Sequence, residues 1–114
     1  MHDTVGEHDH DDFASFVVDI GPVSDPAAFR AGLAAAIREQ DVVRVKGFVD
    51  VADRDRRLVV QAVGNRLEQH FDRPWAAGES RATRLVVIGK TGLDRAAVEA
   101  ALTGAALVGA TGGG

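Results

Sequence analysis

The order of the apolar segments constrains the fold of this chain more than any other feature. Five short segments either alternate between apolar and polar residues or are continuously apolar, as β-strands are. Only two segments carry apolar residues at helical spacing. The predicted strands cover residues 13–20, 42–50, 58–63, 66–72 and 83–89. One helix should lie between the first two strands and the other after the fifth. The sequence therefore predicts an α+β fold with the order βαββββα.

Each predicted helix has one apolar side, so the pair can cover only one face of a sheet. Ser24 or Asp25 can cap the first helix, with Pro26 at its first position, where a missing amide proton costs nothing. Asp94 can cap the second helix, which should end near Gly104. We predict a mixed, mostly antiparallel five-stranded sheet with both helices on one face.

The other face of the sheet should be exposed to solvent or should contact another domain. On the second strand, Val43, Val45 and Val49 should point one way, and Arg44 and Lys46 the other. The tight hairpin expected at residues 64–65 would bring the third and fourth strands together, with Gly and Asn supplying positive φ.

Basic side chains make this uncovered face a candidate docking surface. If Arg44, Lys46 and Arg84 share it, together with Arg66 or Arg81, they could meet a carboxylate-rich partner or the phosphates of a nucleotide held by a neighbouring domain. The alternative is a solvated face with scattered ion pairs, each worth at most about 1 kcal/mol.

Size and charge exclude several classes of protein. The 114 residues suit one domain, and the absence of cysteine rules out disulfides and cysteine nucleophiles. Five of the 17 acids lie in residues 1–12, which hold no Lys or Arg, so the remainder has 12 acids against 13 bases. That balance does not suit nucleic-acid binding. No apolar run is long enough to cross a membrane, and we expect a soluble, cytoplasmic protein.

The expected domain organisation has three parts. Residues 1–12 read as a disordered His/Asp-rich linker or tail, residues 13–104 as the folded domain, and residues 105–114 as a flexible Gly/Ala-rich tail.

Residues 1–12 contain candidate metal ligands. His8 and His10 are two residues apart, so in an extended chain they project the same way and could share one ion, with Asp9 and His2 adding ligands. Imidazole and carboxylate suit cobalt, nickel or zinc. Binding should be weak, because an unstructured segment must be ordered first. The alternative is a solvated acidic linker.

No catalytic constellation stands out. His70 lies near Glu68 and Asp72 on one predicted strand face, where an acid-base or metal site is conceivable, but an edge strand with an alternating polar face is the simpler interpretation. The Gly89-Lys90 pair imitates a phosphate loop, yet Arg84 stands where such a loop needs glycine. Trp75 should cap the core under its loop. We assign no catalytic or cofactor-binding residue.

Several stretches together resemble a known family. They are residues 42–48, 57–64 and 81–89, followed by the helix start at residues 92–94 and preceded by the His/Asp-rich run at residues 8–12. In that order they resemble the C-terminal domain of CobW-type proteins from about Phe13 to Leu102. These proteins are GTP-dependent metallochaperones named for a role in cobalamin biosynthesis.

The resemblance implies a context for this chain. In the family, an N-terminal domain binds and hydrolyses GTP and carries the phosphate loop and a cysteine motif for the metal, which is cobalt in the cobalamin branch and zinc in others. Neither motif occurs here. The implied function is a non-catalytic regulatory or docking domain linked to cobalt delivery. Its implied partners are the GTPase domain and a metal-receiving client such as a cobalt chelatase.

Two other functions remain open on the sequence. The chain could be a stand-alone metal-binding or metal-buffering protein that uses His2, His8 and His10. A weaker alternative is an enzyme that uses His70 with its neighbouring acids.

Overall fold

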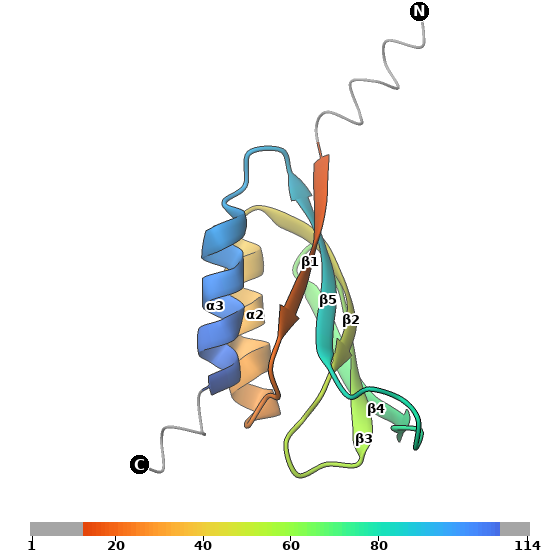
Figure 1. Cartoon of the computed structure of the whole chain (residues 1–114). Coiled ribbons are helices and arrows are strands. Elements are labelled where there is room, and N and C mark those ends of the chain that lie inside the picture. Colours follow the sequence, from red (N-terminus) through yellow and green to blue (C-terminus); the bar gives the residue numbers. More distant parts are fainter. Residues whose placement is uncertain (1–12, 108–114) are drawn as a thin grey trace, which may run out of the picture.

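The computed structural model of the chain describes residues 13–107 and confirms the α+β prediction (Figure 1). Within them, five strands and two helices follow one another in the predicted order. They are β1 (Phe13–Ile20), α2 (Pro26–Glu39), β2 (Val42–Val49), β3 (Arg56–Val63), β4 (Arg66–Pro74), β5 (Thr83–Lys90) and α3 (Arg95–Leu107).

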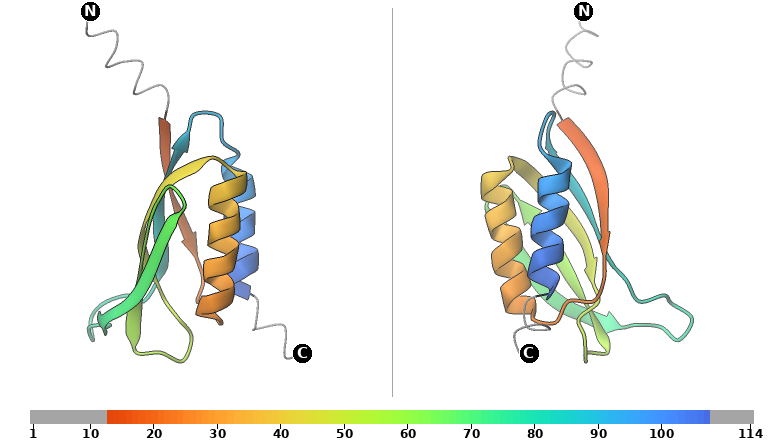
Figure 2. Two further views of the ribbon diagram at one scale, coloured as in Figure 1. Left: turned by 180° about the vertical axis from the view of Figure 1, so that it is seen from behind. Right: turned by 60° about the vertical axis from the view of Figure 1, so that its left-hand side comes forward.

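The sheet has the strand order β1-β5-β2-β3-β4, and all of these neighbours pair antiparallel. β1 and β2 consequently run in the same direction with β5 inserted between them. Among residues 13–107, the parallel element is an isolated bridge between Val23 and Val51. Both helices lie side by side on one face of the sheet, as predicted (Figure 2).

The helices begin where capping side chains predict. The Oδ1 atom of Asp25 accepts hydrogen bonds from the amides of Ala27 (3.0 Å) and Ala28 (3.3 Å), so Asp25 caps α2. Asp94 does the same for α3 by accepting from the amide of Ala97 (3.0 Å). Each carboxylate satisfies amides that have no partner within the helix.

The core lies between the sheet and the helices. α2 buries Phe29, Leu33 and Ile37, and α3 buries Val98 and Leu102. They pack on the inward-facing residues of the strands, which include Val18, Val45, Val60, Leu85 and Val87. Burying one such side chain contributes about 1.5–3 kcal/mol, so this packing fixes which face of the sheet is covered.

A bulge in β2 changes one predicted assignment. The register of β2 against β5 shifts between Val42 and Arg44. Val42 is therefore buried and Val43 only half-buried, and the prediction that Val43 shares the core face with Val45 is wrong. An extra residue in one strand reverses the alternation beyond it. Arg44 and Lys46 still point away from the helices.

Helix α3 ends later than predicted. It passes Gly104 and continues to Leu107. Ala105 and Ala106 are buried, and the Ala106 carbonyl accepts a hydrogen bond from the amide of Ser24 (3.3 Å). Packing against α2 therefore holds the last turn in place despite the low helix propensity of glycine.

The hairpin between β3 and β4 has the predicted two-residue loop. Gly64 has φ of 58°, whereas Asn65 is not among the residues with positive φ. Positive φ at the first loop position alone is the pattern of a type II′ turn. Neither helix described here is long and apolar enough to cross a membrane.

Candidate docking face

The side of the sheet opposite the helices, which we call the open face, collects alternate residues from all five strands. Strand register places Val17, Val86, Lys46, Gln61 and Glu68 next to one another in a row across it. Because side chains in a strand alternate between faces, the residues two positions away form parallel rows. No helix of residues 13–107 covers this surface (Figure 2).

Apolar side chains are concentrated on the open face. The large apolar residues that are exposed within the described chain all lie there: Phe13 (49%), Val17 (44%), Phe48 (38%), Val63 (62%) and Val86 (41%). Exposed apolar residues are common singly, but a group on one face is typical of an interaction surface.

Two adjoining hollows mark the part of this face around Phe48. The first has a volume of about 280 Å³ and lies between Phe48, Val86 and the basic residues Lys46 and Arg84. The second, of about 200 Å³, shares Phe48 and Arg84 and is also lined by Trp75 and Glu79. An apolar side chain of a partner would find aromatic and aliphatic contacts there, with cations at the rim.

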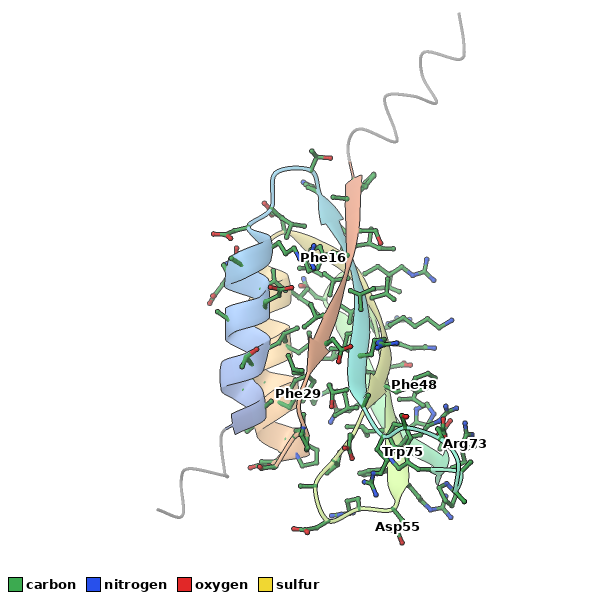
Figure 3. All side chains as sticks on the ribbon, viewed as in Figure 1. Phe16, Phe29, Phe48, Asp55, Arg73 and Trp75 are labelled. Atoms are coloured by element: carbon green, nitrogen blue, oxygen red, sulfur yellow. The ribbon has the colours of Figure 1, made fainter. Side chains whose placement is uncertain are left out.

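Figure 3 shows Phe48 and Trp75 on the side of the sheet away from the helices. The sequence led us to expect that Trp75 caps the core under its loop. Trp75 lies instead on the face of the sheet that the helices do not cover, so that prediction is wrong. The guanidinium of Arg81 lies over its ring at 5.7 Å.

The three residues predicted to dock a partner do come together on the open face. Arg44 and Lys46 project from β2, and Arg84 lies opposite Phe48 on the adjacent β5. Arg84 donates from Nη2 to Oδ2 of Asp19 (2.8 Å), and both side chains are exposed. Neither Arg44 nor Lys46 has an ion-pair partner among residues 13–107, so their charges are available to a partner.

Arg66 and Arg81, the other basic residues considered, behave differently from each other. Arg66 is exposed at the start of β4, on the open face beside Val63. Arg81 instead binds the loop that follows β2. It donates from Nη2 to Oδ1 of Asp50 (2.8 Å) and to the carbonyl of Arg54. Its role is to hold that loop.

A network of charged side chains contacts the ring of Phe48. The guanidinium of Arg57 lies 3.9 Å from the centre of the Phe48 ring and donates to both carboxylate oxygens of Asp72, at 2.9 and 2.8 Å. Glu79 accepts two hydrogen bonds from Arg73, at 2.9 and 3.1 Å, and lies 3.8 Å from Arg57. This network ties the loop after β4 to the open face.

The network also sets the charges of its members. The hydrogen bond from Arg57 lowers the pKa of Asp72 to about 2, and the hydrogen bonds from Arg73 and the Ala76 amide lower the pKa of Glu79 to about 2. The same contact with Asp72 raises the pKa of Arg57. Both carboxylates are therefore fully ionised at neutral pH.

The structure gives no support to an acid-base site at His70. His70 is exposed on β4, which is an edge strand, and the neighbouring Asp72 is held by Arg57. Within residues 13–107, no three His, Asp or Glu side chains are grouped closely enough to hold a metal ion. The metal ligands predicted in the tail, His2, His8, Asp9 and His10, lie outside the described residues.

The sequence interpretation missed the apolar half of the open face. The sequence did indicate it, because Val17 and Val86 each stand between two apolar neighbours. The side chains on both faces of these strands are therefore apolar at these positions. Such runs are typical of strands that are buried on both faces. β5 is indeed an interior strand, but only one of its faces is covered by helices.

Comparisons with known proteins agree on one family. The chain matches the family model for the cobalamin synthesis protein cobW C-terminal domain over residues 13–106. It is 56% identical over 102 residues to the zinc chaperone CobW of Sinorhizobium sp, a match that covers 90% of this chain and 29% of the relative. The zinc chaperone CobW of Pseudomonas aeruginosa is 46% identical over 84 residues, covering 74% of this chain and 22% of that protein. The chain thus spans less than a third of the length of these relatives.

Solved structures share the fold. The Zn(II)-bound YjiA GTPase from E. coli superposes with a TM-score of 0.70 at 23% identity, covering 91% of this chain and 32% of that one. A Zn(II)-bound triple mutant of the YjiA GTPase gives a TM-score of 0.70 at 24% identity, covering 82% and 29%. The family model and the two sequence relatives go further than fold, and the chain belongs to the family of the cobalamin synthesis protein cobW C-terminal domain.

Proposed function

We propose that this chain acts as a non-catalytic docking domain of a metal-chaperone GTPase, in which another domain binds and hydrolyses GTP. Its family and the greater length of its relatives support this role. The names of the two relatives favour zinc as the cargo. Cobalt delivery in cobalamin biosynthesis, which the family resemblance implied, is the less supported alternative.

The composition of the open face is the observation that carries the proposal. Five exposed large apolar side chains share this face with Arg44 and Lys46, whose charges are unpaired within residues 13–107. Interfaces are enriched in aromatic residues and arginine and use opposite charges to fix register. The surface that fits best therefore combines apolar side chains with carboxylates. We assign this surface to the GTPase domain, with a metal-receiving client such as a cobalt chelatase as the second choice.

Direct binding tests the proposal. A GTPase domain of a cobW-type zinc chaperone, produced separately, is titrated with this chain by calorimetry. Lys46→Glu and Val86→Asp each place a negative charge on the open face without touching the core. We expect each to weaken binding at least tenfold, which corresponds to about 1.4 kcal/mol.

Arg30→Glu is the matched control, since Arg30 is exposed on α2 and the charge change equals that of Lys46→Glu. It should leave the affinity unchanged. Equal losses from Lys46→Glu and Arg30→Glu would mean that only net charge matters and would refute docking through the open face. Absence of any binding by the unaltered chain would refute the proposed function itself.

A further inference from the structure

The segment that precedes β1 joins the sheet at a corner of the open face. Phe13, the first residue of β1, pairs with Lys90, the last residue of β5. Its side chain is half exposed and points to the open face, as does that of Lys90. The chain before Phe13 is therefore attached at this corner of the open face.

Charge complements this placement. Residues 1–12 contain five acids and no Lys or Arg. On the open face, Arg44, Lys46 and Lys90 have no ion-pair partner within residues 13–107, and neither has Arg66. Of the three acids that the strands place on this face, Asp19 already pairs with Arg84 and Asp72 with Arg57, which leaves Glu68. Glu79, in the loop after β4, pairs with Arg73. The surface beside the tether thus carries a positive excess.

The segment is long enough to reach these cations. Arg44 pairs with Ile88, two residues before Lys90, and β2 is the second strand away from β1. Neighbouring strands lie about 4.8 Å apart, so Arg44 is about 10 Å across the sheet from β1. Twelve extended residues span up to roughly 40 Å. A short tether also raises the local concentration of the segment at this surface to roughly millimolar.

We propose that residues 1–12 bind the open face of their own domain and compete there with the partner. The regulatory part of this inference rests on the proposed function, since it concerns the same surface. The acidic side chains pair with Arg44, Lys46 and Lys90 while the segment lies over the apolar side chains between them. Exposed ion pairs are weak and are screened by salt, so the segment yields to a partner that also fills the hollow beside Phe48.

Because the chain has no cysteine, a single spin label can be placed without other changes. Val5→Cys carries a nitroxide, and line broadening of backbone amides is measured by NMR on the complete chain. We expect broadening of β1, β5 and β2 amides but not of the exposed side of α2 and α3. The broadening of the β2 amides, which lie farther from the tether, should disappear in 1 M salt, where the Debye length is about 3 Å. Arg44→Glu combined with Lys46→Glu should abolish it, and Arg30→Glu should not.

Several results would overturn the inference. They are broadening spread evenly over both faces, no broadening of β2 amides, or broadening of β2 amides that persists in high salt. A control mixes two preparations, one with the spin label and no isotope, the other with the isotope and no spin label. In this mixture only contact between two copies of the chain can broaden the signals. Broadening of equal size in that mixture would assign the surface to another copy and would contradict binding within one chain.

Competition is measured with the tail neutralised by Asp9→Asn, Asp11→Asn and Asp12→Asn in the complete chain. We expect this variant to bind the GTPase domain several-fold more tightly, and unchanged affinity would refute competition. The two proposals fail separately. The label can report contact when no GTPase domain binds, and a GTPase domain can bind when the label reports none.

Discussion

Replacing Gly47 by alanine should destabilise the domain far more than a single methyl group suggests. Gly47 lies in β2 between Leu85 of β5 and Val60 of β3. A Cβ atom at this position would lie 2.1 Å from the carbonyl oxygen of Arg84 and 2.8 Å from the Cα of Leu85. Both are backbone atoms, so no side-chain rotation relieves the overlap. The two central strands must move apart instead.

The loss in the free energy of unfolding can be estimated from the backbone groups that the added methyl group displaces. Overpacking in a rigid site costs about 1–3 kcal/mol, and the upper end applies because backbone is displaced. Weakening one ladder hydrogen bond adds about 1 kcal/mol. We expect a loss of about 4 kcal/mol in the free energy of unfolding. At 4–8 °C per kcal/mol for a domain of this size, the midpoint of thermal unfolding should fall by roughly 16–32 °C.

Thermal unfolding followed by circular dichroism measures this shift. Gly78→Ala is the control, because a Cβ there meets no atom within 4 Å and the residue does not have positive φ. Its stability should stay within about 0.5 kcal/mol of that of the unaltered chain. If Gly47→Ala changes the midpoint no more than Gly78→Ala does, the close approach of β2 and β5 described here is wrong.

Three further predictions concern acid stability, metal binding and the core. Arg57 lowers the pKa of Asp72 from 3.8 to about 2, so this pair stabilises the folded state fully above about pH 4, and the contribution is lost as the pH falls toward 2. Asp72→Asn should therefore lower the unfolding midpoint most at neutral pH and least near pH 2; a difference that is constant with pH would contradict the assignment. Removing both imidazoles with His8→Ala and His10→Ala should weaken Zn²⁺ binding measured by calorimetry, and equal binding by both chains would eliminate these histidines as ligands. Leu102→Ala removes a fully buried side chain of α3 and should cost about 2–5 kcal/mol in chemical denaturation; a cost below 1 kcal/mol would place Leu102 outside the core.

Much of the candidate site could have been derived before the structure was known. With a two-residue loop at residues 64–65, regular pairing of the hairpin places Arg57 opposite Asp72, and the sequence analysis did not follow the register that far. The placement of Arg44 and Lys46 on one face followed from alternation alone, whereas that of Arg84 needed the register of β5 against β2. Their neighbours on the face did not, because Phe48 and Val86 look like core residues unless the number of helices available to cover the sheet is counted.

The features that local signals were enough to predict are those whose energy lies within a few residues. Asp25 and Asp94 bond to amides of their own helices, and Gly64 adopts a backbone conformation that other residues resist. Such interactions form in the same way whatever the rest of the chain does. The number, type and order of the elements follow from them and from the apolar periods.

Other features arise from contacts between residues far apart in the chain. β5 enters the sheet between β1 and β2, α3 continues past Gly104 because α2 packs against its last turn, and a bulge turns Val42 inward in place of Val43. Each is decided by the free energy of burying one surface against another, which no short stretch of sequence contains. For the same reason the open face, with its exposed apolar side chains, became visible only when all five strands were assembled.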